Sequence, residues 1–330
     1  MPTTPADLTR IAFGRLNASL NLPANPAMLV ARISSESLAY APTVVESPEL
    51  DPSGQLRDSI LVGEGSSGSV EFPLVRSDWF HAMLESVFRS TWGTGMISDE
   101  TSPGVFSAPR AVGPHELIPA KTLHMFDVEK TFATPGGNSY HRYRKEAVGS
   151  LALRVTPNDI LSGTLALLGS ELLDSEAPLA GATYPDPGTY KPFTSPNVTE
   201  VELSGVTETQ CFNALTLTFN SNVRGVPCIG ERADREKALG RFVPTIDGTA
   251  YFISNEHIQA LRDQTEMQLT VTLTDGSGNT YRFFYPRTKF VTAPVTTPGT
   301  NQDVMLPISM RGHYSPQHGY SVLCTRILAA

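Results

Sequence analysis

The stretch Met267-Gln-Leu-Thr-Val-Thr-Leu-Thr274 decides the fold class, because its apolar and polar residues alternate without a break. A period of two places the apolar side chains on one face of a strand and the polar side chains on the other. The stretch from Leu215 to Asn220 alternates in the same way. Asp275-Gly-Ser-Gly-Asn279, directly after the first stretch, is typical of a hairpin loop, since glycine and asparagine tolerate a positive φ.

Similar patterns recur along most of the chain and predict a mainly β protein with antiparallel sheets. Further strand candidates lie at 29–37, 57–62, 69–74, 122–132, 148–155, 199–203, 281–285, 304–310 and 320–326. The 26 glycines and 26 prolines fit the many turns that such a fold needs.

One segment, SDWFHAMLESVFRSTW at 77–92, departs from this period. Its apolar residues recur at the i, i+4 spacing of a helix with one wide apolar face. Ser77 is expected to cap the helix and Gly93 to stop it. We expect Trp79, Leu84 and Phe88 to pack this single flanking helix against a sheet.

The chain shows no strong domain boundary and no short-period repeat. Each half, 1–165 and 166–330, carries a formal charge of −4. We expect an N-terminal arm over 1–28 and one β-domain over 29–330, interrupted by a proline-rich excursion at 175–196. A second, shorter helix is expected over 254–262.

The composition limits the classes of function. A formal net charge of −8 without a basic tail argues against a protein that grips DNA electrostatically. Cys211, Cys228 and Cys324 are odd in number and share no short spacing, so neither a disulfide framework nor a cysteine metal knuckle is expected. The N-terminus does not resemble a secretory signal, and no apolar run approaches the ~20 residues of a membrane span. We therefore expect folding in a reducing cytoplasm.

Four motifs resemble ligand sites but lack the context that the chemistry requires. The G-x-G-x-x-G at 63–68 is followed by a strand-like stretch instead of the helix of a dinucleotide site. Asp275 begins a calcium-like loop whose twelfth position is a proline. The seven histidines, His313 and His318 included, have no ligand spacing, and the basic cluster at 142–145 is expected to form ion pairs or a solvated face. We therefore expect no catalytic, cofactor-binding or metal site.

The order of these features carries a resemblance. Ser34-Ser35-Glu36 lies in an early strand and is followed by Arg57-Asp58-Ser59-Ile60, by a turn with Gly65 and Gly68, and by the helix with Met83-Leu84. Asp275–Tyr281, Tyr285–Lys289, Gln302–Val304, His313-Tyr314 and Cys324–Arg326 come later. This arrangement over 29–327 resembles the tail tube proteins of long-tailed bacteriophages, the major tail proteins of their virions.

The resemblance implies a tail-tube-type β-sandwich or barrel of two packed antiparallel sheets with a flanking helix. It implies a structural, non-enzymatic subunit without cofactors that forms rings, usually hexameric, stacked into a hollow conduit for genome ejection. It also implies as partners the tape measure protein, the tail terminator, distal tail or baseplate proteins and, in a contractile tail, a sheath. The subunit would assemble in the bacterial host cytoplasm and reside in the virion tail.

The resemblance also suggests an assembly loop between ring layers at 46–69, with Gln55, Leu56, Arg57 and Asp58 at its tip. Double-stranded DNA would pass through the tube without specific binding. Because each neutralised phosphate adds affinity and friction, an acidic wall suits a conduit. Polar faces such as that of Thr270, Thr272 and Thr274 could line the wet lumen.

Two other classes of protein remain open. The first is another virion β-protein, namely a decoration, adaptor or tail completion protein, which would form a single ring or a stud. The second is a carbohydrate-binding β-sandwich or an enzyme, which would need exposed aromatic side chains or convergent carboxylates. A bias of 19 arginines to 6 lysines favours a protein rich in contact surface.

Overall fold

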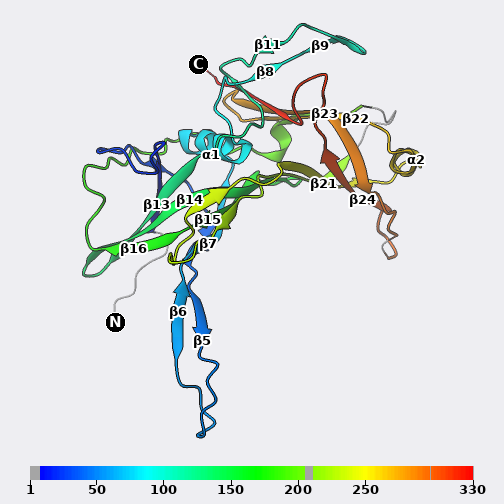
Figure 1. Cartoon of the computed structure of the whole chain (residues 1–330). Helices are drawn as coiled ribbons and strands as arrows, with labels where there is room; N and C mark the ends of the chain where they lie inside the picture. Colours follow the sequence, from blue (N-terminus) through cyan, green and yellow to red (C-terminus); the bar gives the residue numbers. More distant parts are fainter. Residues whose placement is uncertain (1–7, 205–210, 298, 330) are drawn as a thin grey trace.

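The computed structural model describes residues 8–204, 211–297 and 299–329 as a mainly β protein with antiparallel ladders (Figure 1). This confirms the predicted fold class. The first half contains β1 (Arg10–Arg15), β2 (Leu29–Val30), β3 (Ser35–Glu36), β4 (Ala39–Tyr40), β5 (Thr43–Glu46), β6 (Ser59–Gly63), β7 (Ser66–Pro73), α1 (Asp78–Phe88), β8 (Met96–Ile97), β9 (Glu100–Ser102), β10 (Val105–Phe106), β11 (Arg110–Ala111), β12 (Glu116–Leu117), β13 (Met125–Thr134), β14 (Gly137–Val155), β15 (Ser162–Gly169) and β16 (Glu171–Ser175). The second half contains a 3-10 helix at Ser195–Asn197, β17 (Val198–Leu203), β18 (Phe212–Asn220), β19 (Arg224–Val226), β20 (Glu236–Ala238), β21 (Val243–Tyr251), α2 (Glu256–Asp263), β22 (Met267–Thr274), β23 (Thr280–Thr292), β24 (Met305–Gly312) and β25 (Leu323–Ile327).

A long central sheet forms the middle of the molecule. Its strand order is the segment 34–41 (with β3 and β4), β7, β15, the C-terminal half of β14, β18, β21, β24 and the C-terminal end of β23. We call this the central sheet. Its core-facing row runs Phe72, Gly163, Leu153, Leu217, Ile246, Met310 and Phe290, and its residues are buried. The apolar phase of the alternation therefore builds one continuous core face.

Two smaller wings extend from the long strands β14 and β23. The first wing contains β2, β1, β13, the N-terminal half of β14, and β16. The second wing contains β17, β22, the N-terminal part of β23, β25 and β12. The register of β14 shifts between Val148 and Ser150, where the strand passes from the first wing to the central sheet. Each long strand thus ties a wing to the central sheet.

Helix α1 lies between the central sheet and the first wing. The Trp79 ring packs on Phe72 of the central sheet (4.9 Å between centroids) and on Phe13 of the first wing (5.5 Å). Phe88 packs on Phe219 at 5.0 Å. Trp79, Leu84 and Phe88 are buried, with exposures of 3%, 0% and 0%, so the three residues expected to face a sheet all lie in the core.

The start of α1 is as predicted, but its end is not. The Ser77 hydroxyl accepts from the Phe80 N–H, as an N-cap does. The helix ends at Phe88 because Arg89 adopts the left-handed conformation (φ 56°) and its N–H bonds to the Glu85 and Ser86 carbonyls. The predicted extension to Trp92, with Gly93 as the stop, was therefore wrong: an arginine can close a helix in this way when tertiary contacts hold it. The Arg89 guanidinium donates to the Gly240 carbonyl at 2.7 Å.

The structure also tests the predictions for the hairpin at 275–279, the second helix and the strand at 29–37. The hairpin at 275–279 is confirmed, with the Asp275 carboxylate accepting from the Ser277 and Asn279 N–H groups at 2.8 Å. The second helix is α2, close to its expected bounds. The expected strand at 29–37 divides into β2 and β3, because the chain crosses there from the first wing to the central sheet.

Sequence reasoning missed β1, which lies within the expected N-terminal arm. Residues 10–15 pair along their whole length with β13, and Ile11, Ala12 and Phe13 are at most 1% exposed. The proline-rich excursion also returns to the core through Phe193, whose N–H bonds to the Leu74 carbonyl and whose side chain is 0% exposed. None of the helices that the structure describes is long and apolar enough to span a membrane.

The burial of Phe88 gives a stability prediction. Replacing Phe88 with alanine should lower the free energy of unfolding by ~3–5 kcal/mol, because the contacts with Phe219 and Phe242 are lost and a cavity remains. A urea unfolding curve measures the change. Tyr314→Ala, at a 60% exposed site, is the matched aromatic control and should leave the midpoint nearly unchanged. Equal midpoints for wild type and Phe88→Ala would contradict the packing.

Candidate functional site

The most prominent surface feature is the hairpin of β5 and β6, which we call the projecting hairpin (43–63). It extends away from the body in Figure 1, and β8, β9 and β11 lie at the opposite end of the molecule. A loop was expected over 46–69, but paired strands occupy 59–63 and 66–73, so only 47–58 forms the connecting tip. Of the stretch 57–60, Ser59 and Ile60 belong to the second strand of this hairpin.

The projecting hairpin exposes apolar side chains that its own fold does not cover. Val44, Val45, Ile60 and Val62 are 47–55% exposed, and Leu50 at the tip is fully exposed. An isolated two-stranded hairpin is at best marginally stable in water, and contiguous exposed apolar groups mark contact sites. These features favour a protein partner for the hairpin.

The tip is built around Asp51. Its carboxylate accepts from the Arg57 guanidinium and, at 2.8 Å, from the Ser53 N–H, and these bonds hold the pKa of Asp51 below its ordinary value. Glu49 lies 3.8 Å from Arg57. Gln55 and Leu56 are exposed, and the Asp58 carboxylate accepts from the Ser59 N–H. The four predicted tip residues therefore sit together in one acidic turn.

A second, shorter hairpin of β19 and β20 lies beside the root of the projecting hairpin. The Glu64 N–H donates to the Arg232 carbonyl at 2.9 Å, and the two side chains form a 3.8 Å ion pair. Ile229 at the tip of this hairpin is fully exposed. The Lys237 ammonium anchors the hairpin by donating to the Gly169 carbonyl at 2.8 Å.

Glu146 is buried beside the root of the projecting hairpin. One of its carboxylate oxygens accepts from the Ser66 hydroxyl, and the other has no partner among the described residues. Burial raises the pKa of Glu146 to about 8, although Ser66 and Lys237 oppose this shift. The side chain is therefore predominantly neutral at pH 7.

The face of the central sheet that points away from the core forms a second candidate surface, which we call the hydroxyl face. One row across it reads Glu71, Thr164, Ala152, Thr218, Thr245, Arg311 and Lys289. The next row reads Ser162, Arg154, Thr216, Asp247, Ser309 and Thr292. These rows consist mostly of small polar side chains, contain no aromatic residue, and hold one lysine, Lys289 of β23.

The charges in these two rows nearly balance. Glu71 accepts from the Ser35 hydroxyl at 2.8 Å and Asp247 from the Ser309 hydroxyl at 2.6 Å, while Arg154, Arg311 and Lys289 supply three positive charges. The Lys289 ammonium also lies 3.4 Å from the Glu266 carboxylate. The net charge of −8 had suggested an acidic wall, whereas these two rows carry a formal charge of +1. The expectation that Thr270, Thr272 and Thr274 form an open wet face also fails in part, because Thr270 is only 6% exposed.

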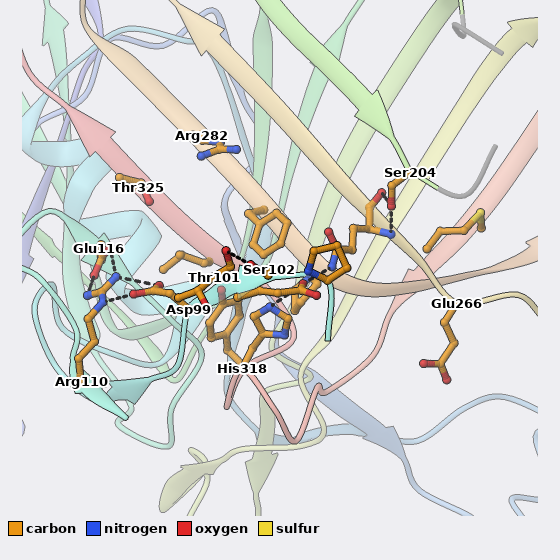
Figure 2. A pocket seen from close by; sticks show the side chains of 18 of the residues that line it. Asp99, Thr101, Ser102, Arg110, Glu116, Ser204, Glu266, Arg282, His318 and Thr325 are labelled. Carbon is orange, nitrogen blue, oxygen red and sulfur yellow. Dashed lines mark hydrogen bonds and ion pairs between the residues drawn. The ribbon is translucent and has the colours of Figure 1, made fainter. Parts of the chain in front are cut away.

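A groove of about 980 Å³ lies between the second wing and the segment 93–121 (Figure 2). From here on we call 93–121 the excursion; it is distinct from the proline-rich segment 175–196. Arg110 joins Asp99 and Glu116 of the excursion through ion pairs. Gln268 of β22 donates to the Glu100 carboxylate at 2.9 Å. Ile97, Val112 and Ile118 form a small apolar cluster with Tyr320 and Leu323, which fixes the excursion on the wing.

The motifs that were expected to be structural lie in structural positions. The G-x-G-x-x-G stretch connects β6 to β7, with no helix after it. Arg142 and Arg144 form ion pairs with Glu129 and Asp127 (both 3.7 Å), as expected for a basic cluster on a strand. His318 contacts Phe106 and Ser315. Within 8–204, 211–297 and 299–329, no group of three or more His, Cys, Asp or Glu side chains is arranged to hold a metal ion.

The comparisons with known proteins identify one family. The model of the family described as phage tail tube protein matches residues 2–312. A search of curated proteins finds no match.

The buried Glu146 predicts a pH dependence of stability. Its folded-state pKa of about 8 lies above the usual value of 4.5, so the unfolded chain releases this proton first. Stability should therefore fall as the pH rises from about 5 to about 8. Glu146→Gln should flatten this slope in urea unfolding curves at several pH values. Exposed Glu49→Gln is the control, and an identical slope for Glu146→Gln and wild type would contradict the burial of a neutral acid.

Proposed function

The chain belongs to the phage tail tube protein family, and from this premise we propose that its copies stack as rings into the hollow tail of a virion and give the genome a passage out. The observation that carries the proposal is the pairing of the hydroxyl face with an apolar projecting hairpin. One surface suits contact with water and DNA, and the other suits contact with protein. The known role of the family is structural, and we propose no catalytic activity.

The hydroxyl face is the proposed lumen wall. A DNA duplex moves freely only along a wall that neither neutralises its phosphates nor stacks on its bases. Side chains such as Thr164, Thr218 and Ser309 keep a hydration layer, and the acids Glu71 and Asp247 offset the two arginines. The remaining cation, Lys289, forms an ion pair with Glu266 at 3.4 Å. A nearly balanced wall of this kind would also leave the phosphates largely unneutralised.

The projecting hairpin is the proposed contact between stacked rings. Its exposed valines, isoleucine and leucines would be buried against the body of a copy in the next ring. The hairpin carries Glu46, Glu49, Asp51 and Asp58 against a single arginine, so its receptor surface should be apolar or basic. Gln55, Leu56, Arg57 and Asp58 remain the proposed contact residues.

The partners follow from the same proposal. A tube of this kind would enclose the tape measure protein, end at a tail terminator and begin at distal tail or baseplate proteins. A contractile tail would add a sheath around it. Assembly would take place in the bacterial host cytoplasm, and DNA would pass without specific binding.

Electron microscopy of the concentrated, purified protein tests the proposal directly. We expect hollow tubes of many stacked rings. Single rings or studs would instead identify a decoration, adaptor or completion protein. A monomer that never assembles would contradict the proposal.

Deleting residues 52–58 should abolish tube formation and leave the body folded, because these residues lie in the tip that connects β5 and β6, on a hairpin that extends away from the body (Figure 1). Micrographs report assembly, and circular dichroism with thermal unfolding reports folding. A gentler pair, Leu50→Ser with Leu56→Ser, should also weaken assembly, whereas Ile327→Ser, at a 60% exposed site away from the hairpin, serves as the control. Normal tubes from the deletion variant would disprove the role of the hairpin.

In a background with Cys211→Ser and Cys228→Ser, which leaves only the buried Cys324, a cysteine at Thr218 should report the lumen. In assembled tubes, Thr218→Cys should react with a small maleimide but not with a maleimide carried on a large protein, because only the small reagent enters the bore. Val105→Cys, on the exposed excursion, should react with both. Equal reaction of Thr218→Cys with the large reagent in tubes and in monomer would place the hydroxyl face on the outside.

A further inference from the structure

The chain contains the same strand arrangement twice. In the first half, segment 34–41 pairs with β7, β7 with β15, β15 with the end of β14, and the start of β14 with β13 and β16. In the second half, β18 pairs with β21, β21 with β24, β24 with the end of β23, and the start of β23 with β22 and β25. Even β1 on β13 has its counterpart in β17 on β22. We call these the first and second repeats.

Spacing and sequence support this correspondence. A hairpin separates the first two central strands in each repeat, namely β5–β6 in one and β19–β20 in the other. A helix begins five positions after the second strand in both, at Asp78 after Pro73 and at Glu256 after Tyr251. Gly137-Asn-Ser-Tyr140 and Gly278-Asn-Thr-Tyr281 open the two long strands. Both tyrosines are buried, at 7% and 0% exposure.

The two repeats are joined inside the chain by one ladder. β18, the first central strand of the second repeat, pairs antiparallel with the C-terminal half of β14. In the second repeat, the end of β23 corresponds to the C-terminal half of β14. In the first repeat, segment 34–41 corresponds to β18. In the described part of the chain, no strand pairs with either of these two edges.

We propose that the free edge at the end of β23 in one copy pairs with segment 34–41 of the next copy, repeating between chains the β14–β18 junction within the chain. Each copy offers one edge of each kind, so the contact is head-to-tail and closes into a ring. Closure pairs both edges, which otherwise invite uncontrolled association. The central sheet and its hydroxyl face then continue around the ring as a barrel.

The number of copies follows from the duplication and rests on the proposed function. Each chain supplies two units of four central strands. The resemblance implies rings that usually hold six subunits. With one four-stranded unit at each of the six positions, the ring would contain three chains and not six.

The two helices differ as this junction predicts. α1 lies over the internal junction, where Phe88 packs on Phe219 of β18, and its residues from Trp79 to Phe88 are all buried. α2 lies over the end of β23, but Ile258 and Leu261 remain half-buried, and Ile253 just before the helix is 52% exposed. The missing cover is what segment 34–41 of a neighbouring copy would supply.

The internal junction also supplies the register. Ser150 pairs with Asn220 there. Thr292 corresponds to Ser150, because it pairs with Ser309 as Ser150 pairs with Ala166. Gly65 occupies the position in the first repeat that Val243 occupies in the second. The Ala41 N–H bonds to the Gly65 carbonyl, and Asn220 pairs with Val243, so Ala41 corresponds to Asn220. Ala41 of one copy should therefore face Thr292 of the next.

Cysteines at these two positions test the pairing. In a background with Cys211→Ser and Cys228→Ser, which leaves only the buried Cys324, tubes of the Ala41→Cys/Thr292→Cys variant are oxidised and run on a denaturing gel. We expect covalent dimers and closed trimers, and no larger species. Each single-cysteine variant and the pair Leu173→Cys/Thr292→Cys, which uses the β16 edge, are the controls and should stay monomeric. Tubes without cross-links would overturn the edge pairing, and a ladder that ends at six would overturn the count.

Wild-type tubes give a second measurement that needs no variant. The excursion 93–121 is inserted in the first repeat only, since α2 is followed directly by β22. Averaged electron micrographs of the tube should therefore show threefold symmetry with three excursions per ring. Sixfold symmetry would overturn the proposal and leave the tube function intact, whereas the absence of tubes would contradict the tube function itself.

Discussion

The structure depends on one constraint: a strand with alternating side chains has an apolar face that must be buried, a polar face that must stay wet, and two backbone edges that must be paired. The central sheet meets the first demand with the row from Phe72 to Phe290 and the second with the hydroxyl face. Within one chain the third demand is met everywhere along this sheet except at its two ends. The proposed assembly is the completion of those ends.

The same constraint explains which parts of the fold were predictable. A period of two marks β22 and β18 in the sequence, and i, i+4 spacing marks the apolar face of α1, because these periodicities do not depend on the packing partner. It fails for β1 (RIAFGR), where both faces are covered and the run is short, and for the end of α1, which a tertiary contact of Arg89 fixes. The apolar residues of the projecting hairpin can be located in the sequence. Their exposure cannot be predicted from it, because exposure depends on which other elements pack against the hairpin.

The net charge of the chain does not predict the charge of the proposed lumen wall. A net charge of −8 is a sum over all surfaces, and it says nothing about any one of them. Much of the acid is held in structural pairs, such as Glu129 with Arg10 and Arg142, and Glu36 with Lys130. Other carboxylates gather on the projecting hairpin. The charges of the hydroxyl face nearly cancel, and side-chain size and hydration become its distinguishing properties.

Duplication also changes what each half of the chain can do. Identical units in a ring must present identical surfaces, so any insertion would appear around the whole circumference. Two fused units escape this restriction: the first repeat has a long projecting hairpin and an excursion over the second wing, while the second repeat has a short hairpin and no excursion. The central strands, which must join in the same way at every junction, retain their common arrangement. The even distribution of charge over both halves fits a repeat whose core is shared, and divergence is confined to loops that no junction uses.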